Sequence, residues 1–230
     1  MMQFGGIQKN SFIDFPGKIS AVLFVSGCNF TCPYCHNPDL AMGKLPNPLT
    51  EEQAYAFLDA RKGLLEAVVL SGGEPTLCKD IFRICRRIKS LEYPIKLDTN
   101  GSQPEVLEKL LEENIINYVA MDIKTDPVAY GPPLAPIGSN DKVLKSIDLL
   151  MSGNVPYEFR TTCVTPFVSH AIMTRIGRRL KGAGAYFLQP FRSQSVLLPD
   201  YCSAAPADTL DLESLRAAVA AFVPTCKVRL

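Results

Sequence analysis

Six short apolar runs, each followed by a segment with helical spacing, constrain the fold of this 230-residue chain more than any other feature. The runs lie at residues 19–25, 67–70, 95–97, 118–124, 157–164 and 185–188. Alternation of this kind is typical of parallel β-strands that are joined by helical crossovers. It predicts an α/β fold, either an incomplete (β/α) barrel or an open doubly wound sheet.

The segments between the runs carry helix-start and helix-stop signals. Thr50-Glu51-Glu52-Gln53 is a capping box, and Gly63 is expected to end the helix that it opens. Further helices are expected over residues 79–89, 104–111, 140–152, 169–180 and 210–222. Because no internal repeat or linker interrupts the pattern, residues 1–230 are expected to form one domain, with a less regular C-terminal extension over 193–230.

Three cysteines follow the first apolar run within the loop Ser26–Pro38. Cys28, Cys32 and Cys35 are spaced so that their thiolates can converge on one metal centre, and they are one short of a closed four-ligand site. In a [4Fe–4S] cluster, which cysteine thiolates hold, three ligands leave one iron open to another molecule. The alternative is a closed zinc site with His36 as the fourth ligand. A disulfide framework is disfavoured because no secretory signal precedes the loop.

Charge and hydropathy disfavour several classes of protein. With 24 basic and 23 acidic residues the net charge is +1, so no bulk attraction to nucleic acid or to a membrane is expected. The first residues lack the basic-then-apolar profile of a signal peptide. No run approaches the roughly 18 apolar residues that a membrane-spanning helix needs. We therefore expect a cytoplasmic protein.

Five further cysteines show no tight ligand spacing. We expect them to be buried structural thiols, because free cysteine packs as a small hydrophobic residue. A second cluster is the alternative. These residues are Cys78, Cys85, Cys163, Cys202 and Cys226.

Polar residues gather at the ends of the predicted strands. Besides Cys28, the residues at or just past a strand end are Glu74, Asp98, Thr99, Asp122, Lys124 and Gln189. In barrels and in open α/β sheets, active sites form at the carboxyl edge of the strands. The strand ends are therefore expected to face one active-site mouth.

These motifs carry a resemblance to a known family. The three cysteines, with Gly72-Gly73-Glu74-Pro75 one strand–helix unit later, resemble the radical S-adenosylmethionine superfamily. Within it, Cys32–Pro38 and Ala120–Lys124 resemble the activating enzymes of glycyl-radical enzymes. Phe12–Lys18 and Phe187–Arg192 are similar to the activating protein of anaerobic ribonucleoside-triphosphate reductase, and the similarity runs over about residues 7–192.

The resemblance implies a fold, two cofactors and partners. The implied fold is an incomplete (β/α)6 barrel of parallel strands with outer helices. A [4Fe–4S] cluster and S-adenosylmethionine would together yield a 5′-deoxyadenosyl radical, which takes a hydrogen atom from a glycine of a partner enzyme. That partner is expected to be anaerobic ribonucleoside-triphosphate reductase, and flavodoxin or ferredoxin is the expected type of external electron donor.

The resemblance also implies which residues bind the cofactor. They are Tyr34, His36, Gly72, Gly73, Glu74, Asp98, Thr99, Asn100, Asp122, Lys124, Arg160 and Gln189. Two glycines let backbone carbonyls approach the cofactor's ammonium group, and a guanidinium such as that of Arg160 matches its carboxylate. Asp98, Thr99 and Asp122 are hypothesised also to hold a monovalent cation, because clustered carboxylates repel one another. A structural ion pair between Asp122 and Lys124 is the alternative.

Three competing functions remain open from the sequence. A pyruvate formate-lyase activating enzyme belongs to the same class, and no residue separates it from the reductase activator. A small-molecule enzyme resembling 7-carboxy-7-deazaguanine synthase has a comparable length, but the run Tyr34–Pro38 argues against it. A zinc-stabilised interaction protein is the non-enzyme alternative.

Overall fold

The computed structural model describes residues 3–45, 48–192, 196–198 and 211–230. Two compact units are present. The first unit comprises Met1–Asn29, Asp39–Thr99 and Glu105–Val119, and the second comprises Phe30–Pro38, Asn100–Pro104 and Ala120–Leu230.

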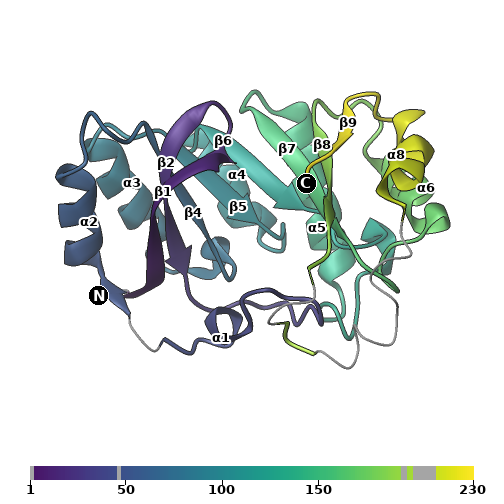
Figure 1. Ribbon diagram of the computed structural model, residues 1–230, viewed down its shortest axis with the longest axis horizontal. Helices are drawn as coiled ribbons and strands as arrows, with labels where there is room; N and C mark the ends of the chain where they lie inside the picture. The colour runs from purple at the N-terminus through teal and green to yellow at the C-terminus, as the bar shows by residue number, and fades with distance from the viewer. Residues whose placement is uncertain (1–2, 46–47, 193–195, 199–210) are drawn as a thin grey trace. The chain divides into compact units, whose positions relative to one another are not determined.

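The strands of the first unit are ordered β3-β1-β2-β4-β5 (Figure 1). Their bounds are β1 Gln3–Phe15, β2 Lys18–Val25, β3 Leu49–Thr50, β4 Ala67–Gly72 and β5 Ile95–Thr99. β2, β4 and β5 run parallel, whereas β1 pairs antiparallel with both β2 and β3. The parallel strands are the three apolar runs predicted in this unit, and their near-continuous burial is typical of a parallel sheet.

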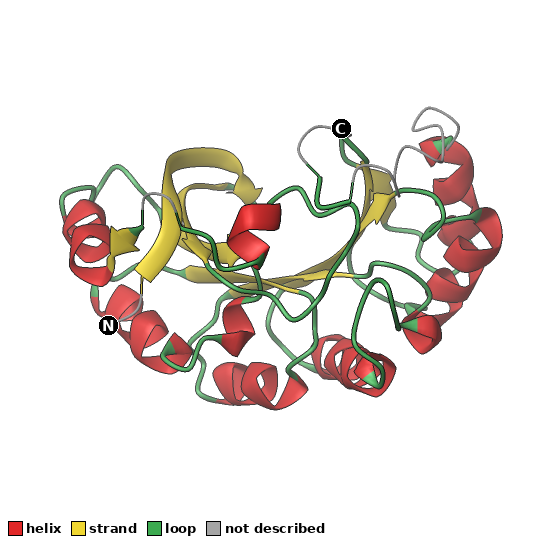
Figure 2. Cartoon of the chain, turned by 90° about the horizontal axis from the view of Figure 1, so that it is seen from below, coloured by secondary structure: helices red, strands yellow, loops and turns green. Residues whose placement is uncertain are grey.

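The longer helices that follow these strands lie on one face of the sheet (Figure 2). They are α2 Glu51–Asp59, α3 Ile81–Ser90 and α4 Pro104–Glu112. Two shorter helices are α1 Pro38–Ala41 and η1 Pro75–Leu77. The predicted capping box is confirmed at α2. The Thr50 amide donates to Gln53 Oε1 at 2.9 Å, and the Gln53 amide donates to Thr50 Oγ1 at 3.2 Å. These two bonds satisfy donors that a helix start leaves without an intrahelical partner.

In the second unit, β7 (Tyr157–Cys163), β8 (Tyr186–Pro190) and β9 (Cys226–Val228) run parallel in that order. β6 (Tyr118–Asp122) enters this unit at Ala120, and just beyond its end the Ile123 amide donates to the Arg160 carbonyl of β7 at 2.7 Å. The helices are η2 Pro127–Ala129, α5 Ser139–Ser152, α6 His170–Arg179 and α8 Leu212–Ala220.

All six predicted strands are present, as β2 and β4 to β8, and the predicted helices correspond to α2 to α6 and α8. The α/β class with parallel strands and outer helices is therefore confirmed. The single-domain boundary stays a prediction. Within the predicted C-terminal extension the structure describes α8 and β9, while Cys202 lies outside the described residues.

The sequence did not reveal β1 as a strand. β1 has register shifts against β2 between Phe4 and Gly6, between Gln8 and Ser11, and between Ser11 and Phe15, so its side chains lack a steady alternation. The segment Phe12–Lys18 is the end of β1 and the turn into β2, where Gly17 has φ +71°. Among the described residues, no helix combines the length and hydropathy needed to cross a bilayer.

Candidate active site

The cysteine loop begins at the end of β2, where the Gly-Gly-Glu segment at the end of β4 holds it. The Gly73 amide donates to the Val25 carbonyl at 2.8 Å, and the Glu74 amide donates to the Gly27 carbonyl at 2.8 Å. The two motifs that carry the family resemblance are therefore joined by backbone hydrogen bonds in the first unit.

The last two residues of α1 also hold this stretch. The Gly27 amide donates to the Leu40 carbonyl at 2.9 Å, and the Cys28 amide donates to the Ala41 carbonyl at 3.0 Å. Gly27 itself has φ +87°, a left-handed conformation that favours glycine. The backbone amides of Gly27 and Cys28 are therefore both hydrogen-bonded, which fixes the chain at the first cysteine of the loop.

Both glycines of the Gly-Gly pair are required by the packing of the chain on itself. A Cβ on Gly73 would lie 2.0 Å from the Gly27 carbonyl oxygen, which no side chain can accommodate. A Cβ on Gly72 would lie 2.5 Å from the Val25 carbonyl oxygen, and Gly72 also has φ +111°. From the sequence, these glycines were expected to let the cofactor approach the backbone. The structure shows a second reason for glycine at both positions, which is their close contact with the backbone of Val25 and Gly27.

Glu74 is fully buried, and one of its carboxylate oxygens is shared by two threonines. Oε1 accepts from the Thr76 amide at 3.1 Å, from the Thr76 hydroxyl, and from the Thr99 hydroxyl at 2.8 Å. The structure therefore brings Glu74 and Thr99, both expected site residues, together at the ends of β4 and β5. Thr76 was not expected there.

Asp98 has two partners that the sequence had not suggested. The Lys96 ammonium lies 2.6 Å from Asp98 Oδ1, and the Ser71 hydroxyl donates to Asp98 Oδ2 at 2.9 Å. The signal was present as Lys-x-Asp, because residues two apart on a strand share one face. A lysine within an apolar run is usually interpreted as a strand residue whose ammonium reaches solvent, so the buried ion pair was not predicted.

Cys32 and Cys35 belong to the second unit. The Cys35 amide donates to the Cys32 carbonyl at 3.0 Å, which closes a turn between them. The Thr31 amide donates to the Leu134 carbonyl at 3.0 Å, and the Leu198 amide donates to the Pro33 carbonyl at 2.9 Å. These two hydrogen bonds hold the loop directly before the Cys32–Cys35 turn and within it.

The expected cofactor contacts Tyr34 and His36 also fasten this loop. Tyr34 is buried against Phe167, with ring centroids 5.3 Å apart, and its hydroxyl donates to the Lys124 carbonyl at 3.4 Å. Burial raises the pKa of the Tyr34 phenol well above its ordinary value. His36 stacks on Phe191 at 5.7 Å, and its Nε2 lies 2.8 Å from the Arg192 carbonyl oxygen.

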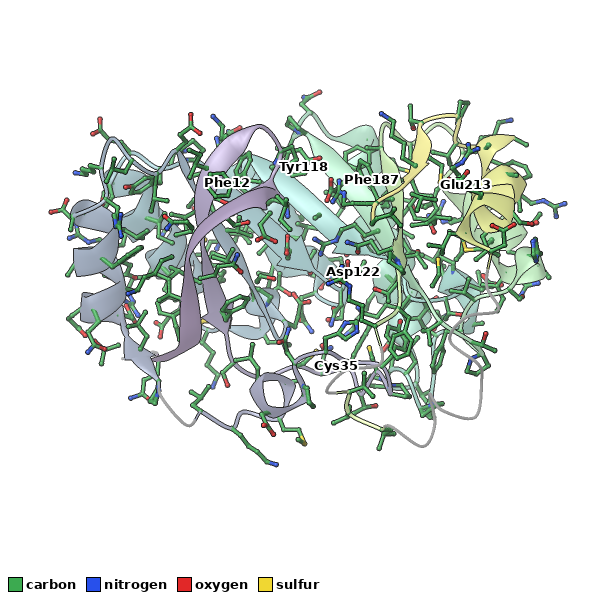
Figure 3. The ribbon with its side chains drawn as sticks, in the orientation of Figure 1. Phe12, Cys35, Tyr118, Asp122, Phe187 and Glu213 are labelled. Carbon is green, nitrogen blue, oxygen red and sulfur yellow. The ribbon has the colours of Figure 1, made fainter. Side chains whose placement is uncertain are left out.

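Asp122 lies at the carboxyl end of β6 (Figure 3) and pairs with two cationic side chains. Arg160 Nε donates to Oδ1 at 2.8 Å, and Lys124 Nζ lies 3.2 Å from Oδ2. Burial alone would raise the pKa of Asp122, but Arg160 and Lys124 overcome it and lower that pKa to about 2. The ion pair between Asp122 and Lys124, the alternative weighed from the sequence, is present, and Arg160 joins it.

The two remaining expected residues lie in the second unit. Asn100 is buried, and its Oδ1 accepts from the Ser102 amide at 2.9 Å, so it shapes the turn after β5. Gln189 lies in β8 opposite Thr162 of β7 and is partly buried. Their roles toward a cofactor stay predictions.

Among the other cysteines, Cys85, Cys163 and Cys226 are buried, as expected, and Cys78 is partly buried. Burial raises the pKa of the Cys85 thiol and of the Cys163 thiol to about 12. Such thiols are protonated at neutral pH and are poor metal ligands. Cys78 lies before α3, whereas Cys85 lies within it.

The donor chemistry of the cysteine loop fits an iron–sulfur cluster. Among the described residues, no three side chains of His, Cys, Asp or Glu stand close enough together to hold a metal ion. Cys28 and Cys35 are partly exposed, Cys32 is buried, and all three thiols lie on one short loop whose backbone is fixed at several points. Cysteine thiolates are the ligands that hold such clusters.

The fold and the loop together define an α/β protein that presents three thiols beyond a strand end. The sequence pattern of the Radical SAM superfamily matches residues 22–169, and the chain belongs to that superfamily. Enzymes of this family use a [4Fe–4S] cluster and S-adenosylmethionine.

Named relatives extend this assignment. The chain is 39% identical over 191 residues to "Putative glycyl-radical enzyme activating enzyme MJ1227" of Methanocaldococcus jannaschii, covering 81% of this chain and 78% of that protein. It is 28% identical over 153 residues to the AdoMet-dependent heme synthase of Methanosarcina barkeri, covering 63% of this chain but only 42% of that protein.

A solved structure shows the same fold. The radical SAM methyltransferase from Sphaerobacter thermophilus superposes with a TM-score of 0.62 at 17% identity, covering 96% of this chain and 68% of that one. At this identity the likeness shows the fold alone, and it is consistent with the incomplete (β/α)6 barrel predicted from the sequence.

Proposed function

We propose that this radical S-adenosylmethionine enzyme activates a glycyl-radical enzyme by taking a hydrogen atom from the α-carbon of one glycine in that partner. The observation that carries the proposal is the 39% identity, over 81% of the chain, to a protein described as a glycyl-radical enzyme activating enzyme. The coarser assignment to the superfamily rests on the matched pattern over residues 22–169 and does not depend on this step.

The cluster and S-adenosylmethionine supply a 5′-deoxyadenosyl radical when both are bound. The ligands that we assign to the cluster are Cys28, Cys32 and Cys35. The chain's own contribution is to fix these thiols and to orient the cofactor. The backbone is held by hydrogen bonds that the Gly73 and Glu74 amides donate to it and by the one that the Leu134 carbonyl accepts from it.

Arg160, Lys124 and Asp122 form a group that suits a carboxylate ligand. Two cationic side chains face one carboxylate, so the group carries one surplus positive charge. A guanidinium also binds carboxylates through several parallel N–H donors. We assign this group to the carboxylate of the cofactor's amino acid part, with Asp122 holding the two cations in place.

We propose anaerobic ribonucleoside-triphosphate reductase as the partner. The support is the resemblance of Phe12–Lys18 and Phe187–Arg192 to its activating protein. The first segment covers the end of β1 and the turn into β2, and the second covers most of β8 and the two residues after it. Pyruvate formate-lyase is the competing partner, and an external electron donor such as flavodoxin or ferredoxin is needed in either case.

One anaerobic preparation tests the proposal. Iron, sulfide and zinc are counted, the protein is reduced with S-adenosylmethionine, and 5′-deoxyadenosine is measured. Each candidate glycyl-radical enzyme is then added, and its glycine radical is sought by electron paramagnetic resonance. A radical on one candidate, and none on its variant with that glycine replaced by alanine, supports the activase.

Two results would separate the levels of the assignment. Zinc without iron would favour an interaction module and contradict the cluster. Turnover of S-adenosylmethionine without a radical on any glycyl-radical enzyme would leave the superfamily intact and contradict activation, favouring a small-molecule substrate.

A further inference from the structure

Lys96 and Asp98 form an ion pair that is almost entirely removed from solvent. The Lys96 ammonium lies 2.6 Å from Asp98 Oδ1, and the exposed fractions of the two side chains are 1% and 11%. Lys96 ranks among the largest fully buried side chains of the described chain. Lysine is rarely buried to this degree, so this position calls for an explanation.

The pairing register shows how the sheet builds this pair. β4 and β5 are parallel with Val69 opposite Lys96 and Leu70 opposite Leu97, which brings Ser71 beside Asp98. The Ser71 hydroxyl donates to Asp98 Oδ2 at 2.9 Å. Val69 belongs to an apolar cluster with Phe15, Val22 and Ala67. The aliphatic part of the Lys96 side chain therefore begins beside this apolar cluster, and its ammonium extends toward the carboxyl end of β5.

The charge of the pair is balanced without any bound ion. One Asp98 oxygen receives an ammonium and the other receives a hydroxyl donor. A buried charge is tolerated only when it is paired and hydrogen-bonded. A metal cation on the same carboxylate would stand next to the ammonium and be repelled by it.

We propose that the Lys96 ammonium is a built-in cation for Asp98, which takes the place of an exchangeable potassium or sodium ion at the carboxyl end of β5. Lys96 is a positioning residue: it compensates the charge of the Asp98 carboxylate, whose other oxygen accepts from Ser71. The proposal differs from the hypothesis drawn from the sequence, in which Asp98, Thr99 and Asp122 together hold a monovalent cation. The inference rests on contacts within the first unit and does not depend on the glycyl-radical partner.

The test compares the full chain with its Lys96→Ala variant, purified without metals. Thermal midpoints are measured in potassium, sodium and choline chloride at equal ionic strength. We expect wild type to be indifferent to the choice of salt. In the variant, Asp98 has lost its cation and a space has opened beside it, so potassium or sodium should raise the midpoint over choline. The expected rise is about 3–6 °C at a concentration tenfold above the dissociation constant.

Two further variants control the result. Lys62→Ala removes another lysine–aspartate pair of the same unit, Lys62 with Asp59 at 3.1 Å. Because both of those side chains are exposed, the thermal midpoint of this variant should be the same in all three salts. Lys96→Ala combined with Asp98→Asn removes both charges and should abolish the response.

A direct measurement on wild type keeps the proposal falsifiable even where Lys96→Ala does not fold. Thallium-205 resonance detects a bound monovalent cation, and no bound signal is expected for wild type. A bound thallium signal that Asp98→Asn removes would overturn the proposal. So would a folded Lys96→Ala variant whose midpoint is the same in all three salts.

Discussion

Gly73 lies so close to Gly27 that a Cβ added to it would stand 2.0 Å from the Gly27 carbonyl oxygen. The Gly73 amide also donates to the Val25 carbonyl, so the end of β4 and the start of the cysteine loop pack as one piece of backbone. Two motifs that are far apart in the sequence thereby share a structural requirement. Because Gly73 and Gly27 are in such close contact, a substitution in either motif is expected to displace the other.

Gly73→Ala should push the cysteine loop away from β4. Because backbone atoms occupy the space, we expect a loss of about 1–3 kcal/mol in the free energy of unfolding, together with reduced iron content. Urea denaturation and iron analysis measure the two effects. Gly184→Ala is the matched control, since nothing lies within 4 Å of its added Cβ. Equal stability of the two variants would contradict the packing argument.

Cys32→Ala should lose most of the iron that the protein binds, whereas Cys85→Ala should keep it. Cys32 lies in the loop turn closed by Cys35, and Cys85 is buried in α3 with a pKa raised by burial to about 12. Iron and sulfide counts on anaerobically reconstituted protein decide the matter. If both variants lost iron equally, the division of the cysteines into ligands and core residues would be wrong.

Asp122→Asn should destabilise the protein at neutral pH and lose this effect in acid. The pKa of Asp122 is lowered to about 2, below the ordinary value of 3.8, so the folded state holds this carboxylate charged. The stability that it contributes is present above pH 4 and disappears as the pH falls toward 2. With the side chain 33% exposed, about 1–2 kcal/mol is expected after solvent screening.

Urea denaturation of wild type and Asp122→Asn at several pH values between 6 and 3 measures this gap. Asp148→Asn is the control, because Asp148 pairs with Arg179 at the surface and is 64% exposed. A gap between wild type and Asp122→Asn that stays constant down to pH 3 would contradict the ion-pair explanation.

Cys85→Ala should flatten the alkaline loss of stability. The folded thiol has a pKa of about 12 against an ordinary value of 9.0, so above pH 9 the unfolded chain releases a proton that the folded chain retains. Stability therefore falls as pH rises through this window, by about 1.4 kcal/mol per unit. Between pH 8.5 and 10.5 wild type should lose about 2 kcal/mol more than the variant. Ile84→Val, also buried but not titratable, should follow the wild-type slope.

Much of the fold could be predicted because its signals are local. The apolar runs became β2 and β4 to β8, and the Thr50–Gln53 capping box formed its two predicted hydrogen bonds. β1 was missed because its register shifts remove the alternation on which strand prediction depends. The expected site residues Glu74 and Asp122 do lie at strand ends, but their hydrogen-bond partners were only partly foreseen.

The sequence by itself determined the family, the alternation of β2 and β4 to β8 with helices, and the set of three thiols, since each of these depends on residue type and short-range spacing. Only the tertiary structure decided that Lys96 and Ser71 hold Asp98, that Arg160 and Lys124 share Asp122, and that Gly73 meets Gly27. Most of these contacts join different strands and loops. Their register is set by packing over the whole sheet, which no local window of sequence contains.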